Sequence, residues 1–363
     1  MFEFYQKNDC LSIFPTSIDK HFERCYNLVN FFDLGVDFMK CLINQNGTRE
    51  IKQSEPLVPK DGECVFSVKA CGICGSDLPR VFNGTSYYYP IVLGHEFAGI
   101  VKDSVSPELI GKRACVFPIL PCGECEFCKK EQWANCTHYD YYGSRRDGGM
   151  QSELLIKESN LVFIPDNVNY LSASMIEPTA VCLHAVKKAN INDQSSVLIY
   201  GAGTIGLLCA MWAKALGAKR VMLSDPNSER MNFALNLGFE KYDHTPVDVI
   251  LEASGVGVAL NDAIVNCKPF GEIVLVGHGK KDVVIPHENF ALILRKQLKL
   301  YGTWNSDFKS DVNDWKDSIT AISNGVICPE KLITHQIPVK DADRAFKIIE
   351  DGTEFYNKIT VVD

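Results

Sequence analysis

The sequence has no apolar run long enough to cross a bilayer and no excess of positive charge. Nowhere do about 18 apolar residues follow one another, so no membrane span is expected. Its 37 Lys and Arg are outnumbered by 45 Asp and Glu, and the net charge of −8 argues against general binding to nucleic-acid phosphates. Residues 1–10 lack the basic cluster and apolar core of a secretory signal. No repeat or low-complexity segment is evident.

Length and composition predict a globular protein of two domains. The 363 residues exceed the usual limit of a single hydrophobic core. Hydrophobic residues at 46% and charged residues at 23% are ordinary for a folded chain. The 15 cysteines, in a long chain without a secretory signal, favour metal binding over a disulfide framework. We therefore expect a cytoplasmic protein that binds metal.

The pattern of the chain changes near residue 166. From Met39 to Pro165, alternating segments such as Glu63–Ala70 and frequent Gly and Pro predict β-structure. Beyond that point, helical patterns at Thr204–Leu216 and Ser228–Leu237 separate short apolar strands, which are expected at Ser196–Tyr200, Arg220–Ser224, Val247–Ala253 and Glu272–Val276. This alternation predicts right-handed βαβ units and a parallel sheet. A final strand is expected at Lys358–Val362.

A glycine-rich turn follows the first strand of the parallel half. Within GAGTIG, Gly201 allows a tight turn, Gly203 lets the backbone approach a pyrophosphate, and Gly206 lets helix and strand pack closely. Thr204 and Ile205 open the helix whose N-terminus then faces the phosphates. The position between strand and helix favours a dinucleotide site over a glycine turn of an unrelated α/β protein.

An acidic residue at the end of the next strand selects the dinucleotide. Asp225 stands 19 residues after Gly206, where a carboxylate can accept hydrogen bonds from both adenosine ribose hydroxyls. It would repel a 2′-phosphate, so the sequence predicts NAD rather than NADP. Arg230 lies nearby and leaves some tolerance of NADP open.

Two groups of potential metal ligands precede the glycine turn. Four cysteines within 15 residues can enclose one tetrahedral Zn²⁺ and leave no open position, which predicts a structural zinc at Cys122, Cys125, Cys128 and Cys136. Surface thiols or an iron–sulfur cluster are the alternatives. Three further motifs, GICGSD, GHEF and IEP, contribute Cys74, His95 and Glu177. Together these suit a zinc that keeps one position free for substrate or water.

Residues 39–363 resemble the zinc-dependent medium-chain alcohol and polyol dehydrogenases. The resemblance rests on GICGSD (72–77), GHEFAG (94–99), the CGECEFC lobe, IEP (176–178) and YGAGTIGLL (200–208). It implies an α/β protein with a Rossmann-type, doubly wound parallel sheet and a β-rich, GroES-like catalytic domain. The implied boundaries are 39–187 and 306–363 for the catalytic domain and 188–305 for the NAD-binding domain. Residues 1–38 form an extension that could be a misassigned start, a loose tail or an arm that packs on a partner.

The resemblance also implies roles for site residues. The catalytic zinc ligands fall on Cys74, His95 and Glu177. Glu96 can approach the metal, Ser76 falls on the proton relay, Asp77 braces the site, and Lys358 is either a contact to the cofactor pyrophosphate or an ordinary exposed lysine. Two zinc ions per subunit, NAD and a homodimer or homotetramer are expected.

Several stretches resemble the polyol-phosphate branch, the galactitol-1-phosphate 5-dehydrogenases. They are CGSDLPRVFNG, YYPIVLGHEF, YGSRRDGG and LRKQLKLYGTWNS. The branch implies oxidation of galactitol 1-phosphate to tagatose 6-phosphate with NAD. A phosphate needs a cationic partner, and the candidates, which could equally be surface charges or ion pairs with Asp77 or Asp147, are Arg80, Arg145 and Arg146. Residues that could line the substrate cleft are Tyr87, Trp304 and Asn305.

Two other functions remain open at this point. One is an unphosphorylated polyol dehydrogenase of the sorbitol or butanediol type, and the other is a non-enzymatic member that retains NAD binding. The intact zinc and relay residues argue against the second. The chain also departs from the family at Gly238–Val249, which is too short for the extra helix that members carry there, and at the trimmed loop Ile100–Arg113.

Overall fold

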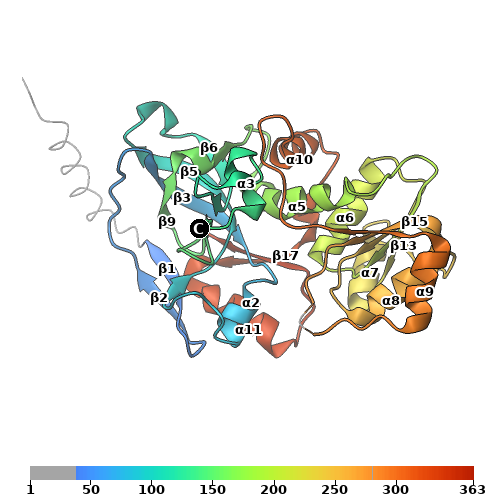
Figure 1. Cartoon of the computed structure of the whole chain (residues 1–363). Coiled ribbons are helices and arrows are strands. Elements are labelled where there is room, and N and C mark those ends of the chain that lie inside the picture. Colours follow the sequence, from blue (N-terminus) through green and yellow to red (C-terminus); the bar gives the residue numbers. More distant parts are fainter. Residues whose placement is uncertain (1–37, 280) are drawn as a thin grey trace, which may run out of the picture.

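The computed structural model describes residues 38–279 and 281–363 and shows two β-sheet halves joined through a central helix (Figure 1). The predictions for the extension 1–38 lie almost wholly outside the described residues. No helix in the described ranges is long and apolar enough to span a membrane.

One half is built on a seven-stranded, mostly antiparallel sheet in the order β10-β6-β5-β3-β18-β17, with β9 also paired to β3. Its strands are β3 (Glu63–Gly72), β5 (Glu96–Ser104), β6 (Arg113–Val116), β9 (Glu153–Lys157), β10 (Leu161–Phe163), β17 (Ile333–Pro338) and β18 (Lys358–Val362). A smaller sheet pairs β1 (Met39–Ile43) with β2 (Arg49–Gln53) and β4 (Ile91–Val92). The core of this half includes the ring contacts of Phe97 with Phe66 and Tyr142.

The other half is a six-stranded parallel sheet in the order β13-β12-β11-β14-β15-β16. Its strands are β11 (Ser196–Tyr200), β12 (Arg220–Ser224), β13 (Glu240–Lys241), β14 (Val247–Glu252), β15 (Cys267–Leu275) and β16 (Lys299–Gly302). The helices around it are α6 (Thr204–Ala215), α7 (Ser228–Asn236), α8 (Gly257–Asn266) and α9 (His287–Lys296). The parallel sheet beside a β-rich catalytic half confirms the predicted fold class.

Six described α-helices lie outside the parallel half. They are α2 (Leu78–Phe82), α3 (Glu126–Lys129), α4 (Tyr170–Ser174), α5 (Ile176–Val186), α10 (Asp314–Ser323) and α11 (Ala342–Asp351). Helix α5 is almost wholly buried, contacts both α6 and α10, and lies between the halves in Figure 1. Helix α11 buries Ala342, Ala345 and Phe346 at helical spacing and so covers the end of the large sheet. A residue in the first turn of α5 is therefore placed at the junction.

The short stretch after α7 forms an edge strand instead of a helix. Within the described chain, α7 ends at Asn236, β13 pairs in parallel with β12, and β14 follows at Val247. Arg220 at the start of β12 donates hydrogen bonds to Glu240 and Asp243. These bonds stabilise the pairing of β13 with β12. The predicted absence of the extra helix thus agrees with the described structure.

Candidate active site

Three potential metal ligands converge where β3 and β5 pair. Cys74 follows the end of β3, His95 immediately precedes β5, and Glu96 is its first residue. Because Gly72 lies opposite Glu96 in the antiparallel register, the two strand ends meet. One ligand atom from each of Cys74, His95 and Glu96 lies within 4.8 Å of the others. Pairing of two distant segments therefore builds the cluster.

Glu177 lies in the first turn of α5 and is buried in the same environment. Burial raises the pKa of its carboxyl group to about 7, Glu96 and Asp77 add to this rise, and His95 and Lys358 oppose it. Its carboxylate is outside the group of three ligand atoms that lie within 4.8 Å. The role of Glu177 as a zinc ligand therefore stays a prediction, whereas Glu96 already lies among the ligand atoms.

The chemistry of this cluster suits a divalent cation. Asp77 Oδ2 accepts a hydrogen bond from the Cys74 backbone N–H at 3.0 Å, while its Oδ1 lies 3.6 Å from His95 Nδ1, too far for a hydrogen bond. Within the described residues, Asp77 Oδ1 and His95 Nδ1 are both buried and have no hydrogen-bond partner. Burial opposes the charged form of His95, yet Cys74 and Asp77 raise its pKa well above the ordinary value. A partly buried thiol beside a buried imidazole and a buried carboxylate fits zinc, and a cation there would relieve the clustered negative charge.

Lys358 contacts the metal cluster. Its Nζ forms a buried ion pair with Glu96 and donates to the Ile73 carbonyl oxygen at 2.9 Å. The side chains of Lys358 and Glu96 are only 4% and 2% exposed. The burial of Lys358 contradicts the alternative of an ordinary exposed lysine, whereas a contact with the cofactor pyrophosphate stays a prediction.

The four-cysteine lobe is folded for a tetrahedral ion. One sulfur from each of the four predicted cysteines lies within 4.8 Å of the others. Cys128 Sγ is 3.5 Å from Cys125 Sγ and 3.8 Å from Cys122 Sγ, close to the roughly 3.8 Å expected from Zn–S bonds of about 2.3 Å. The Cys128 backbone N–H donates to the Cys125 sulfur and lowers the pKa of that thiol to about 6. A lowered pKa favours the thiolate that binds metal.

The glycine turn has the close approaches that its sequence predicts. Gly201 adopts a positive φ of 98°, which favours glycine. A Cβ on Gly206 would lie 2.9 Å from the Gly201 carbonyl carbon and closer still to its oxygen, whereas a Cβ on Gly203 would meet only Arg230 Nη1, at 4.0 Å. Gly206 is thus required for packing, and Gly203 leaves an open face beside Arg230 for a ligand.

Asp225 braces the glycine turn from the end of β12. Its Oδ2 accepts from the Ala202 backbone N–H and its Oδ1 from that of Asn227, both at 2.8 Å. Arg230 Nη1 lies 4.0 Å from the same carboxylate. A residue that the sequence did not indicate, Asn357, also meets the turn, because Thr204 Oγ1 donates to its backbone oxygen at 3.0 Å. Asn357 immediately precedes Lys358, so only its place in the sequence could have suggested it.

Comparisons with known proteins agree with this arrangement. The pattern of the alcohol dehydrogenase GroES-like domain matches residues 60–166, and that of the zinc-binding dehydrogenases matches 204–324. Galactitol 1-phosphate 5-dehydrogenase of Escherichia coli K12 is 32% identical over 323 residues, which are 82% of this chain and 92% of the relative. The chain belongs to the zinc-dependent medium-chain dehydrogenases.

Other relatives in this family differ in substrate. Sorbitol dehydrogenase of Bombyx mori is 30% identical over 85% of this chain and 94% of its own length. The crystal structure of galactitol-1-phosphate dehydrogenase from E. coli superposes with a TM-score of 0.81 at 29% identity, covering 90% of this chain and all of that one. An E. coli CFT073 dehydrogenase complexed with NADH matches with a TM-score of 0.81 at 26% identity, over 91% of this chain and all of that one. This medium-chain dehydrogenase is therefore an oxidoreductase that uses zinc and a nicotinamide dinucleotide.

The three arginines proposed for a substrate phosphate have different environments. Arg146 Nε pairs with Asp140 at 2.7 Å, and Arg80 Nη1 donates to the Ser76 carbonyl oxygen. Arg145 lies against the rings of Tyr87 and Tyr139, which are 4.6 and 4.2 Å from its guanidinium carbon. None of the three forms an ion pair with Asp77 or Asp147 within residues 38–279 and 281–363. The alternative ion pairs considered from the sequence are therefore wrong for the described structure.

Trp304 and Asn305 lie near the four-cysteine lobe. Trp304 is 58% exposed, and its ring is 6.4 Å from that of His278, which follows β15. It lines a cavity of about 220 Å³ together with residues 131–135 of the lobe and 306–309 of the adjoining loop. Asn305 adopts a positive φ of 57°. Their contact with substrate stays a prediction.

A third cluster of potential metal ligands, His184, Asp307 and Asp314, lies beside this cavity, and its negative charge is neutralised by lysines. His184 Nδ1 lies 3.1 Å from Asp314 Oδ2 and 3.6 Å from Asp307 Oδ2. Lys187 reaches Asp314 at 3.0 Å, and Lys309 reaches Asp307 at 3.2 Å. Because each carboxylate already has an ammonium partner, the group is best described as an ion-pair network that ties α5 to α10.

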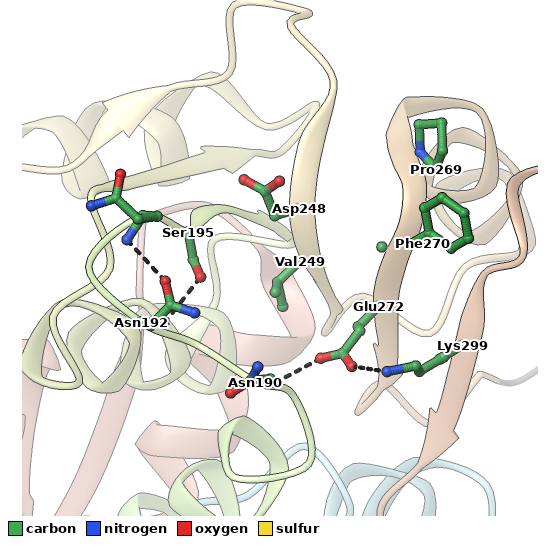
Figure 2. A pocket seen from close by; sticks show the side chains of 11 residues that line it. Asn190, Asn192, Ser195, Asp248, Val249, Pro269, Phe270, Glu272 and Lys299 are labelled. Carbon is green, nitrogen blue, oxygen red and sulfur yellow. Dashed lines mark hydrogen bonds and ion pairs between the residues drawn. The ribbon is translucent and has the colours of Figure 1, made fainter.

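A larger cavity, of about 370 Å³, lies away from the catalytic groups (Figure 2). Its lining comes from the amino ends of β11, β14 and β16 and from Phe270–Glu272 of β15, opposite to the strand ends that carry the glycine turn. Glu272 there accepts from the Asn190 backbone N–H at 2.6 Å and from Lys299 Nζ at 3.0 Å. Ligands of open α/β sheets bind at the carboxyl ends of the strands, so this cavity is not the active site.

Proposed function

We propose that this dehydrogenase oxidises a secondary hydroxyl of a polyol phosphate, converting galactitol 1-phosphate to tagatose 6-phosphate with NAD as hydride acceptor. The observation that carries the proposal is the convergence of Cys74, His95 and Glu96 at the end of β3, beside Glu177 of the helix that joins the halves. The 32% identity to galactitol 1-phosphate 5-dehydrogenase supports the choice of substrate.

The metal sites take distinct roles in this proposal. Cys74, His95 and Glu177 would hold a catalytic zinc, which when bound polarises the oxygen of the substrate hydroxyl. The four cysteines of the lobe would hold a structural zinc. Glu96 forms a buried ion pair with Lys358 beside the catalytic site and would approach the cation from there. Asp77 fixes the Cys74 backbone.

In this proposal Ser76 carries the proton away from the substrate hydroxyl. It lies two residues after Cys74 and is exposed, while its carbonyl oxygen is held by Arg80. A serine hydroxyl can accept one proton while it donates another. We therefore assign the proton relay to Ser76.

The cofactor in the proposal is NAD. Gly203, Thr204 and Ile205 open α6 toward the pyrophosphate, and the positive end of that helix favours its charge. The carboxylate of Asp225 beside the turn would repel a 2′-phosphate, although Arg230 offsets part of its charge. NAD should be preferred, with some turnover of NADP.

The proposed assembly is supported by an exposed edge of the parallel sheet. Strand β16 is an edge strand of the parallel sheet, and α9 beside it exposes Phe290 and Leu294. We propose a cytoplasmic homodimer or homotetramer in which these edges pair. The substrate is a small molecule, and no nucleic acid or membrane is a partner.

A substrate panel tests the proposal. Zinc-loaded protein is assayed for NADH or NADPH formation with galactitol 1-phosphate, galactitol, sorbitol and 2,3-butanediol. The proposal expects the highest kcat/KM with galactitol 1-phosphate and NAD. Preference for sorbitol, which the relative from Bombyx mori makes the second candidate, would reassign the enzyme to unphosphorylated polyols. No turnover with any alcohol would favour a non-enzymatic member of the family.

A pair of cysteine variants tests the catalytic zinc. Cys74→Ser should lose turnover and about one zinc per chain while it folds normally, since a serine hydroxyl is a poor zinc ligand. Cys328→Ser is the matched control, because Cys328 belongs to neither cluster and its thiol donates to the Gly325 carbonyl oxygen. Full activity of Cys74→Ser would contradict the ligand assignment.

A further inference from the structure

Arg145 is a cation without an anionic partner in the described part of the chain. Its neighbour Arg146 pairs with Asp140, but no carboxylate of the described residues lies within ion-pair distance of Arg145. Its guanidinium carbon lies 4.6 Å from the ring centre of Tyr87 and 4.2 Å from that of Tyr139. A fixed positive charge that lacks a counter-ion is free to bind an anion.

The guanidinium is held in place but keeps most of its donors. Nη1 donates to the Tyr139 carbonyl oxygen at 2.9 Å, and Nη2 donates to the Tyr87 hydroxyl at 3.2 Å. These bonds occupy two of the five N–H groups of an arginine, so a fork remains for bidentate contact with oxyanions. The aromatic contacts orient the fork, which lowers the entropy lost on binding.

The same loop connects Arg145 to the metal cluster. The Tyr139 ring contacts the Tyr141 ring at 6.2 Å between centres, and Tyr141 contacts the His95 ring at 5.6 Å. Burial, and then the negative charges of Glu177 and Cys74, raise the pKa of Tyr141, which agrees with a position beside the cluster. Arg145 thus lies two aromatic rings away from the metal-site histidine, on its outer side.

The position of the phosphate in such a substrate agrees with a binding site outside the metal cluster. The relative's name places oxidation at carbon 5 and the phosphate at carbon 1, near opposite ends of the carbon chain. With the reacting hydroxyl at Cys74 and His95, the phosphate must lie outside the metal pocket. Tyr87, which is 66% exposed, borders this outer position.

We propose that Arg145, held between Tyr87 and Tyr139, binds the phosphate group of the substrate and determines the preference for a phosphorylated polyol. This inference rests on the proposed function. Arg146 is less available because it is paired with Asp140, and Lys358 because it is buried against Glu96. Arg80, like Arg145, donates to a main-chain oxygen, but no aromatic ring of the described residues stacks on its guanidinium as Tyr87 and Tyr139 do on that of Arg145.

The test compares two adjacent arginines in the full-length, zinc-loaded enzyme. For each variant, kcat/KM is measured with galactitol 1-phosphate and with galactitol, and their ratio is the readout. Arg145→Gln should lower the ratio roughly 10- to 100-fold, mainly through KM, since a hydrogen bond to a charged group contributes that much. Arg145→Lys should give an intermediate ratio, because it keeps the charge but loses the fork. Arg146→Gln should keep the wild-type ratio.

Inorganic phosphate gives a second readout. It should inhibit the wild type competitively against galactitol, and the inhibition constant should rise at least 10-fold in Arg145→Gln. A wild-type ratio in Arg145→Gln, or a loss of preference only in Arg80→Gln, would overturn the inference and leave the proposed function intact. Failure of the proposed function is seen in the wild type itself, as no NADH from any polyol. A wild type indifferent to phosphate would overturn both the phosphate substrate and the role of Arg145.

Discussion

Gly72 offers a direct test of how tightly the metal cluster is packed. It is the last residue of β3, opposite Glu96 in the register. A Cβ at Gly72 would lie 2.8 Å from Lys358 Cε and closer still to Glu96 Oε2. Because Glu96 and Lys358 form a buried pair, neither side chain can move into solvent without breaking it. The clash in Gly72→Ala must therefore displace the pair itself.

The expected magnitude follows from overpacking. Adding a methyl group to a filled site costs about 1–3 kcal/mol of the free energy of unfolding. Gly75→Ala is the matched control three residues away, since a Cβ there has no atom within 4 Å. It should change stability by less than about 0.5 kcal/mol. Both substitutions restrict the unfolded chain in the same way, so their difference reports the contact at Gly72.

The assay is urea unfolding of each zinc-loaded variant, followed by tryptophan fluorescence, together with NADH formation from the preferred polyol. Gly72→Ala should unfold at lower urea than Gly75→Ala. It should also lose turnover, because the displaced Glu96 lies among the metal-ligand atoms. Equal unfolding midpoints and equal turnover in the two variants would refute the packing argument.

Three further predictions address the glycine turn, the lobe and the ion-pair network. Gly206→Ala should lower the unfolding midpoint, whereas Gly203→Ala should keep the fold and weaken NAD binding, as measured by NADH fluorescence titration. Cys125→Ser should remove about one zinc per chain and destabilise the protein, and metal analysis with thermal unfolding checks this. Asp314→Asn should destabilise by about 1–3 kcal/mol near neutral pH. Contacts with His184 and Lys187 outweigh burial and lower the pKa of Asp314, so its contribution is present above the unfolded pKa and is lost as pH falls through the folded one. Urea unfolding at several pH values should therefore show the two proteins converging in acid.

The features that could be predicted from the sequence are those whose residues lie close together along the chain. The four cysteines lie within 15 residues, and the glycine turn lies directly between β11 and α6. Local geometry therefore determines both of them. Residues 72–77 and 94–97 could be assigned only through resemblance, because their meeting depends on the pairing of β3 with β5.

The contacts missed by sequence reasoning join distant segments. Lys358 and Glu96 are 262 positions apart, and only the addition of β18 to β3 brings them together. Asn357 meets Thr204 across 153 positions. The stacking of Arg145 depends on Tyr87 from another loop, so no spacing in the sequence could separate this arginine from Arg146.

The neighbouring positions of Asn357 and Lys358 have a mechanical consequence. Asn357 is hydrogen-bonded to the turn that opens α6, and Lys358, the next residue, is anchored in the opposite half. The peptide bond between these two residues therefore links an attachment in one half to an attachment in the other. A relative rotation of the halves must thus turn about this point or break one of the two attachments.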